Sequence, residues 1–499
     1  MLVLIGLTAD LAGCDGKQDD RHSEDRNAEA RGEPRFDEAK REEQRPSRAP
    51  GEAYAQVEDN PVTATAEQAV STFAVDVDTA SYSNVRRFLN AGTRPPPDAV
   101  RIEELVNYFD YAYPAPVGDV PFSVVQEIAD CPWNGEARLV HIGLQARALP
   151  VDQLPARNLV FLLDVSGSME SADKLPLLRR SMKLMVETLD ADDRVAIVVY
   201  AGAAGVVLEP TSGADQQAIM AALDRLEAGG STNGGQGIER AYDLARQNFE
   251  TGAINRVILA TDGDFNVGTT SQDDLERLIE RERESGVFLS VLGLGTGNLN
   301  DATMELLADK GNGNYAYLDS IEEARKVLIT EAGGTLVTVA KDVKVQVEFD
   351  PTQVASHRLI GYENRLLAER DFEDDSKDAG EIGAGHSVTA MYEIVLADQA
   401  APGKPIAQLD LRYKLPEGQR SEPIGVPIVD RGTSLAESSD DFRFAAAVAE
   451  FGLLLRGSES MGSANWQQVA ALAQAALGED RGGYRHEFVE LVGKASDLD

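Results

Sequence analysis

Residues 158–170 read NLVFLLDVSGSME, and this stretch decides the fold. Its apolar run ends at an acid, Asp164, which is followed by Ser166 and Ser168 with a glycine between them. A short apolar run that ends in small polar residues predicts a strand buried on both faces. Because a helical pattern begins near residue 174, the D-x-S-x-S sequence is expected on a strand-to-helix loop, where open α/β sheets bind their ligands.

Asp164, Ser166 and Ser168 offer one carboxylate and two hydroxyl groups. All three are hard oxygen ligands that suit Mg²⁺, Mn²⁺ or Ca²⁺, although three oxygens do not complete an octahedron. The same residue types are also preferred at helix N-caps. Capping of the following helix is therefore an alternative interpretation.

Two later stretches add oxygen ligands at what we expect to be the same edge of the sheet. Thr232 lies in GGSTNGGQG, a glycine-rich loop between two helical patterns. Asp262 directly follows a second apolar strand, expected at 255–260. Because the carboxyl ends of parallel strands meet at one edge, both residues are expected near Asp164.

These residues resemble the metal-ion-dependent adhesion site of the von Willebrand factor type A domain. The residues that match its pattern, in order, are Asp164, Ser166, Ser168, Thr232 and Asp262. The resemblance implies that the hydroxyl groups bind the metal directly and that one or both carboxylates act directly or through water. It also implies that the remaining position takes an Asp or Glu of a protein partner. Since metal and partner complete one shell, each would raise the affinity of the other.

The whole pattern from 151 to 332 predicts a doubly wound, mostly parallel α/β domain of the Rossmann-like kind, because strands and helices alternate. Strands are expected at 158–163, 194–200, 205–209, 255–260, 286–293 and 314–318, and helices near 174–189, 215–227, 235–249, 272–285, 300–309 and 320–331. The strand at 205–209 follows its predecessor too closely for a parallel crossover, so it is expected to be an antiparallel edge.

Two flanking regions are expected around this domain. Residues 71–150 predict a small α+β region, with a strand near 73–77, two helices and an antiparallel hairpin within 120–148. Residues 333–499 predict β-sandwich-like strands followed by three helices. The segments RIEELVNYFDYAYP (101–114) and CPWN (131–134), together with the C-terminal region, resemble YfbK-like bacterial lipoproteins, and this resemblance covers roughly 70–499.

The first residues, MLVLIGLTADLAGC (1–14), indicate the compartment. The apolar run is too short to span a bilayer, which needs about 20 residues, and it fits a signal peptide. Its end resembles the bacterial lipobox, in which Cys14 is acylated, although no Lys or Arg precedes the run and Asp10 interrupts it. The resemblance implies a lipid anchor in the cell envelope, and Asp15 resembles the signal that retains some lipoproteins at the periplasmic face of the inner membrane.

Composition limits the remaining possibilities. Residues 15–70 are dominated by charged residues, Ser and Pro, so they predict a disordered tether. The formal net charge of −37 argues against nucleic acid as a partner, because phosphate binding needs a basic face. Apart from Cys14 the chain has one cysteine, Cys131, which is expected to be a buried small hydrophobe.

The leading hypothesis is a membrane-anchored, non-enzymatic binding protein, since the chain contains no G-x-S-x-G elbow, Walker loop or H-E-x-x-H motif. One alternative is a hydrolase that uses the same divalent ion as a Lewis acid. Another is a scaffold in which the metal is purely structural. The sequence leaves the partner, the choice of ion and the oligomeric state open.

Overall fold

The computed structural model describes residues 51–499 except 76–77, 151–152, 233, 264–271, 332–335 and 378, and in 272–273 it describes the backbone only. The expected signal peptide, Cys14 and the first part of the expected tether lie outside the described residues. Among the helices that are described, none combines the length and the apolar character needed to cross a bilayer.

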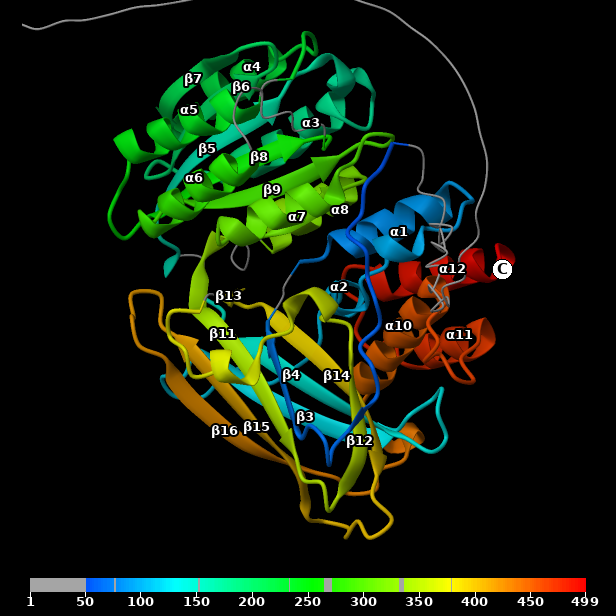
Figure 1. Cartoon of the computed structure of the whole chain (residues 1–499). Coiled ribbons are helices and arrows are strands. Elements are labelled where there is room, and N and C mark those ends of the chain that lie inside the picture. Colours follow the sequence, from blue (N-terminus) through cyan, green and yellow to red (C-terminus); the bar gives the residue numbers. More distant parts are fainter. Residues whose placement is uncertain are drawn as a thin grey trace, which may run out of the picture. The chain divides into compact units, whose positions relative to one another are not determined.

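A six-stranded sheet forms the centre of the α/β domain predicted at 151–332 (the A domain), with helices on both faces (Figure 1). The strands in sheet order are β10 (Tyr315–Leu318), β9 (Phe288–Leu294), β8 (Ile254–Thr261), β5 (Arg157–Asp164), β6 (Arg194–Tyr200) and β7 (Ala204–Ser212). All neighbours are parallel except β7, which pairs antiparallel with β6. The sequence prediction of a doubly wound, mostly parallel domain with one antiparallel edge is confirmed.

Both faces of β5 are buried, as its unbroken apolar run predicts. Leu159, Phe161 and Leu163 join one core, while Val160 and Leu162 join the core on the opposite face. The first core is covered by α3 (Leu175–Val186), α4 (Gln216–Asp224) and α8 (Ile321–Arg325), which continues as a π-helical turn over Lys326–Thr330. The second is covered by α5 (Gly234–Gln247), α6 (Gln272–Glu284) and α7 (Asp301–Lys310).

Two antiparallel sheets share a third core and form the expected β-sandwich. One sheet has the order β1 (Thr63–Ala64), β12 (Val354–Ile360), β14 (Ser387–Leu396), β4 (Arg138–Ala146) and β3 (Phe122–Asp130). The other has the order β13 (Gly380–Gly383), β11 (Thr338–Phe349), β15 (Pro405–Lys414) and β16 (Glu422–Val429), with β2 (Val70–Ala74) also paired to β11.

Residues 71–150 and 333–499 were expected to form separate regions, but they contribute strands to the same sandwich. The predicted hairpin β3–β4 exists, but β4 also pairs with β14, and β2 pairs with β11. The physical reason is that a two-stranded hairpin cannot bury an apolar face by itself. Its missing partners come from the far side of the A domain in the sequence.

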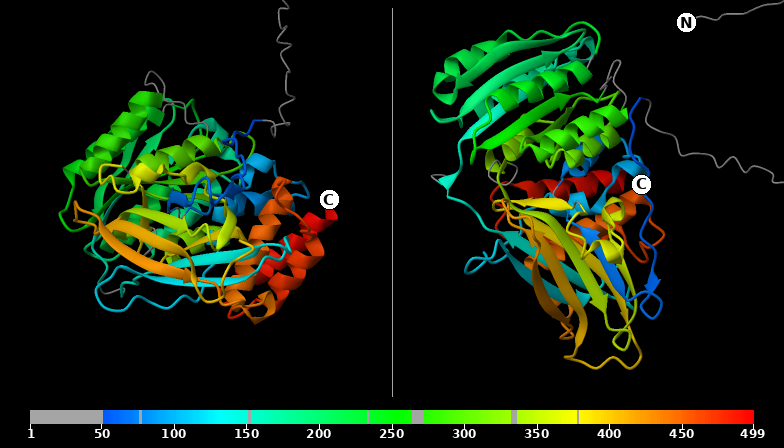
Figure 2. Two further views of the ribbon diagram at one scale, coloured as in Figure 1. Left: turned by 60° about the horizontal axis from the view of Figure 1, so that its bottom comes forward. Right: turned by 60° about the vertical axis from the view of Figure 1, so that its left-hand side comes forward.

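The helices from the two ends of the described chain also form one layer, which Figure 2 shows from two further sides. Its members are α1 (Ala80–Asn90), α2 (Ile102–Asn107), α10 (Asp440–Arg456), α11 (Trp466–Ala475) and α12 (Tyr484–Asp497). Phe109, just after α2, contacts Phe444 of α10 and Phe488 of α12 and so joins the early and late parts of this layer.

Residues 51–70 correct the prediction of a disordered tether that extends to residue 70. The Ala53 amide donates to the Leu299 carbonyl at 2.8 Å, and the Asp301 amide donates to the Ala53 carbonyl at 2.9 Å. Farther along, β1 pairs with β12, and the Asn60 side chain donates to two backbone carbonyls. The polar composition of these residues predicted disorder, because composition carries no information about backbone hydrogen bonds to distant strands.

Candidate functional site

The D-x-S-x-S loop begins at the carboxyl end of β5. Asp164 is fully buried, and its Oδ1 accepts a hydrogen bond of 2.8 Å from the Ser166 amide. The hydroxyl oxygens of Ser166 and Ser168 lie 2.9 Å apart, and a short 3₁₀ helix, Gly167–Glu170, starts between them. Asp164, Ser166 and Ser168 are thus gathered on one loop.

Capping of the next helix does not explain these residues. The N-cap of α3 is Lys174, and no side chain makes a capping hydrogen bond there. Ser166 is the N-cap of the 3₁₀ helix, also without a side-chain capping bond. The alternative interpretation is therefore wrong, and the two hydroxyl groups contact each other instead.

Backbone hydrogen bonds bring the second loop to the first. The Gly167 amide donates to the Gly230 carbonyl at 3.1 Å, and the Gly229 amide donates to the Val165 carbonyl at 2.8 Å. Thr232 follows two residues after Gly230, half-buried, just before α5. The loop that carries Thr232 is therefore held against the loop that carries the serines.

Asp262 follows β8 and is fully buried at the same edge of the sheet. Its Oδ2 lies 2.9 Å from the Nζ of Lys174, which also donates to the Asn298 Oδ1 at 2.8 Å. Ser168 and Asn298 also hydrogen-bond to the Asp262 carboxylate. Lys174 and Asn298 were not predicted as site residues. A signal for Asn298 existed, because its loop follows β9, and the carboxyl end of this parallel strand lies at the same edge of the sheet.

Three family models match the chain. The von Willebrand factor type A domain model matches residues 158–329, the model "von Willebrand factor" matches 48–141, and the model "Uncharacterized protein YfbK, C-terminal" matches 334–498. A relative from Escherichia coli (strain K12), "Uncharacterized protein YfbK", is 46% identical over 469 residues, which cover 89% of this chain and 81% of the relative. The chain belongs to the YfbK family.

Two further matches are more distant. "Uncharacterized protein sll0103" from Synechocystis sp. is 24% identical over 309 residues, covering 58% of the YfbK-family chain and 69% of that relative. Among solved structures, "von Willebrand factor type A from Catenulispora acidiphila" matches with a TM-score of 0.43 and 17% identity, over 72% of this chain and 88% of that one.

The two carboxylates of the YfbK-family site differ in their electrostatics. Burial raises the pKa of Asp164 to about 6, against the opposing hydrogen bonds from Ser166, and the nearby Asp262 charge raises it further. Burial also acts to raise the pKa of Asp262, but hydrogen bonds from Ser168, Lys174 and Asn298 outweigh it, so that pKa is lowered. Among the described residues, Lys174 pairs with Asp262, whereas no ion pair is found for Asp164.

The chemistry of the donor set fits a hard divalent ion. It consists of two carboxylates and three hydroxyl groups, all oxygen ligands. In the described part of the chain, no group of three or more His, Cys, Asp or Glu could hold a metal ion. A metal at this edge of the sheet would therefore depend on the hydroxyl groups of Ser166, Ser168 and Thr232.

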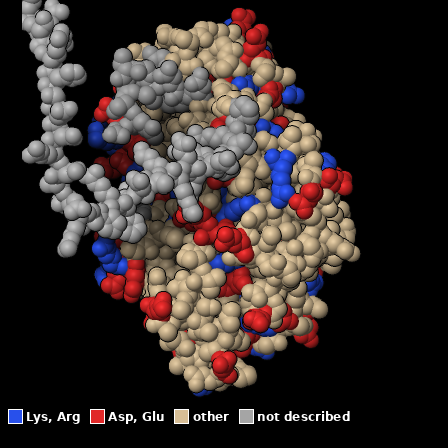
Figure 3. Space-filling view, turned by 45° about the vertical axis from the view of Figure 1, so that its right-hand side comes forward, with Lys and Arg blue, Asp and Glu red and all other residues tan. Residues whose placement is uncertain are grey.

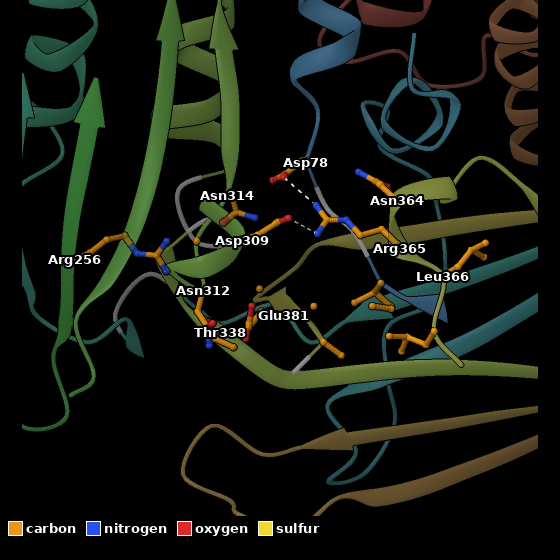
Figure 4. A pocket seen from close by; sticks show the side chains of 17 residues that line it. Asp78, Arg256, Asp309, Asn312, Asn314, Thr338, Asn364, Arg365, Leu366 and Glu381 are labelled. Atoms are coloured by element: carbon orange, nitrogen blue, oxygen red, sulfur yellow. Dashed lines mark hydrogen bonds and ion pairs between the residues drawn. The ribbon is translucent and has the colours of Figure 1, made fainter. Parts of the chain in front are cut away.

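A second polar site lies away from these residues. A cavity of about 200 Å³ is lined by Arg256 from β8, by Asp78, and by Arg365, whose Nη1 lies 2.6 Å from Asp309 Oδ2 (Figure 4). None of the five predicted site residues lines this cavity. Its lining contains two arginines and three carboxylates, those of Asp78, Asp309 and Glu381, so the acidic groups exceed the basic ones by one.

The remaining cysteine is buried, as predicted, and surface charge can be followed on one face of the molecule. On the face shown in Figure 3, Lys and Arg are interspersed with Asp and Glu, and no continuous basic surface is seen there. Cys131 is a buried free thiol, and burial raises its pKa to about 12, which suppresses the reactive thiolate.

Proposed function

We propose that this YfbK-family protein binds a protein partner through a divalent metal ion, Mg²⁺ or the related Mn²⁺ or Ca²⁺, held at the edge of the A-domain sheet. The observation that carries the proposal is the meeting of three loops. The D-x-S-x-S loop, the Thr232 loop and Asp262 share one edge, and the serine hydroxyls are not used for helix capping.

Each of the chain's own residues has a defined part in this proposal. Ser166, Ser168 and Thr232 would supply neutral oxygen ligands, while Asp164 and Asp262 would supply negative charge directly or through water. The bound ion supplies an electrophilic position for one further carboxylate. A partner Asp or Glu fits that position because the site itself contributes only two carboxylates, and a further one would be attracted to the ion.

The proposal includes a lipid anchor at Cys14 in the cell envelope, on the periplasmic face of the inner membrane. Acyl chains contribute about 0.8 kcal/mol for each buried CH₂ group, and two or more chains give stable anchoring. Mass spectrometry of the N-terminal peptide from membranes tests this part. We expect an acylated Cys14, and an unmodified thiol would contradict the anchor.

Calorimetric titration of the full chain with Mg²⁺, Mn²⁺ and Ca²⁺ tests the metal site. We expect saturable binding to one site in the wild type and its loss in the Ser166→Ala/Ser168→Ala double variant. Ser171→Ala is the matched control, because this serine lies on the same loop but outside the D-x-S-x-S pattern.

The alternatives predict different results in the same proteins. A structural metal would be required for stability but not for partner binding, whereas we expect Asp164→Ala to abolish metal-dependent partner binding. A hydrolase would show metal-dependent turnover in a screen of phosphoester and peptide substrates. If wild type and double variant bind the ion equally, the proposal is wrong.

A further inference from the structure

A lysine is built into the edge of the candidate metal site. Lys174 is nearly buried, with 6% of its surface exposed, and its Nζ lies 2.9 Å from Asp262 Oδ2 and 2.8 Å from Asn298 Oδ1. It stands at the N-cap of α3, where its side chain makes no capping bond. Its ammonium group is directed toward the site.

The backbone makes room for this lysine. Gly295 has a φ of +72°, and a Cβ on it would lie 2.2 Å from the Lys174 Cε and 2.3 Å from the Lys174 Cγ. The Gly295 carbonyl is held by the Tyr317 hydroxyl at 2.7 Å. A side chain at position 295 would therefore displace the lysine stem, and only glycine accepts this φ without strain. The position of the ammonium group is therefore fixed by the loop after β8, through Asp262, and by the loop after β9, through Asn298.

The charge of the site depends on Lys174. Asp164 and Asp262 supply two negative charges, and Lys174 returns one positive charge directly to Asp262. A divalent ion would then leave the site with one net positive charge. Without the lysine, the two carboxylates would neutralise the ion completely, and attraction for a further carboxylate would be weaker.

We infer that Lys174 keeps the bound ion short of neutralisation, so that an acidic side chain of a partner is needed to complete the site. This inference rests on the proposed function and deepens it. It makes Lys174 a specificity-determining residue that weakens binding of the metal alone and strengthens the coupling between metal and carboxylate.

A purely structural role for Lys174 predicts the opposite change. If the lysine only held Asp262 in place, its removal would loosen that carboxylate and weaken metal binding. If the lysine sets the charge, its removal strengthens metal binding. The stability of the metal-free protein falls in either case, because the buried Asp262 carboxylate loses its cation.

The experiment is calorimetric titration of the full chain with Mn²⁺ and Mg²⁺. We expect Lys174→Met to bind metal about ten-fold more tightly, since a unit charge a few ångströms from a divalent ion has at least this effect even in water. Lys174→Arg should stay near the wild type because it retains the charge. Lys183→Met, which removes a half-buried lysine of α3 that pairs with Asp224 outside the site, is the matched control.

A second variant and a second readout test the inference even if Lys174→Met does not fold. Asn298→Asp leaves Lys174 in place but adds a negative charge beside it, so it should also tighten metal binding. The second readout uses acetate in place of the partner's carboxylate. Replacing chloride with acetate at equal ionic strength should raise the apparent metal affinity of the wild type more than that of Lys174→Met.

The outcomes separate this inference from the proposed function. Wild-type protein that binds no metal would overturn both. Wild-type protein that binds metal, with Lys174→Met and Asn298→Asp binding no more tightly, would overturn the role of Lys174 alone.

Discussion

At the scale of single residues, Asp164 shows how the site opposes stability. The carboxylate is fully buried at the end of β5, and burial raises its pKa from an ordinary value of 3.8 to about 6. Between these two pH values the folded protein holds more protons than the unfolded chain, so stability falls as pH rises through this window. Above about pH 6 the full cost of the buried charge is present.

We therefore expect Asp164→Asn to stabilise the metal-free protein at pH 8, by about 1–3 kcal/mol, because the buried charge is removed. At about pH 2.8 the difference should nearly vanish, since the wild-type carboxyl is then mostly protonated in both the folded and the unfolded state. Urea denaturation in the presence of a chelator at the two pH values measures this. The variant should also lose metal binding, and a variant less stable than wild type at pH 8 would contradict the argument.

At the scale of elements, most helices and strands of the A domain lie within a few residues of their predicted ranges, because each carries its own apolar periodicity. Asp78 shows what such local patterns leave out, because it precedes α1 but is bonded to a distant strand. The N-cap of α1 is Thr79, which makes no side-chain capping bond, whereas Asp78 Oδ1 accepts from the Tyr315 amide at 2.8 Å. This contact joins residues far apart in sequence, so local pattern could not predict it.

Helix α10 contains a second carboxylate with an unusual environment. Glu450 is fully buried, its Oε1 accepts from the Asn465 amide, and its Oε2 has no hydrogen-bond partner among the described residues. Burial raises its pKa from 4.5 to about 7, against the opposing hydrogen bond from Asn465. The contribution of Glu450 to stability therefore falls as pH rises from about 4.5 to about 7.

Glu450→Gln should raise the free energy of unfolding at pH 8 by about 1–3 kcal/mol, because the amide keeps the Asn465 contact and carries no charge. At pH 4 the variant and the wild type should be equally stable. Denaturation at both pH values measures the difference. Glu459→Gln, in the exposed turn after α10, is the control and should change stability little at either pH.

At the scale of the whole molecule, buried arginines connect the N-terminal helices to the A domain. Arg86 on α1 lies 2.5 Å from Asp319 Oδ1 and 2.7 Å from Glu323 Oε2, and 3.1 Å from Glu487 Oε2 on α12. Arg101 pairs in a similar way with Asp301 at 2.6 Å. These contacts link segments on both sides of the A domain in the sequence.

Arg86→Met should destabilise the protein by about 3–5 kcal/mol, because it leaves buried carboxylates without their cation. Arg94→Met, which breaks an exposed pair with Asp499, should cost at most about 1 kcal/mol. Chemical denaturation measures both. Equal effects of the two substitutions would show that the Arg86 cluster does not stabilise the assembly of helices.

By itself the sequence determined the α/β domain, its antiparallel edge, and the three loops that carry Asp164, Ser166, Ser168, Thr232 and Asp262. It could do so because apolar periodicity and short motifs are local properties of the chain, and parallel strands order their loops at one edge. The β-hairpin and the terminal helices were also predicted as elements.

Only the tertiary structure decided which elements become partners. In the folded protein, strands and helices from both flanks form one sandwich and one helical layer. Residues 51–70 form hydrogen bonds with distant segments. The tertiary structure also placed Lys174 beside Asp262. The physical reason is that burial and hydrogen bonding between distant segments depend on three-dimensional proximity, which no local pattern of residues encodes.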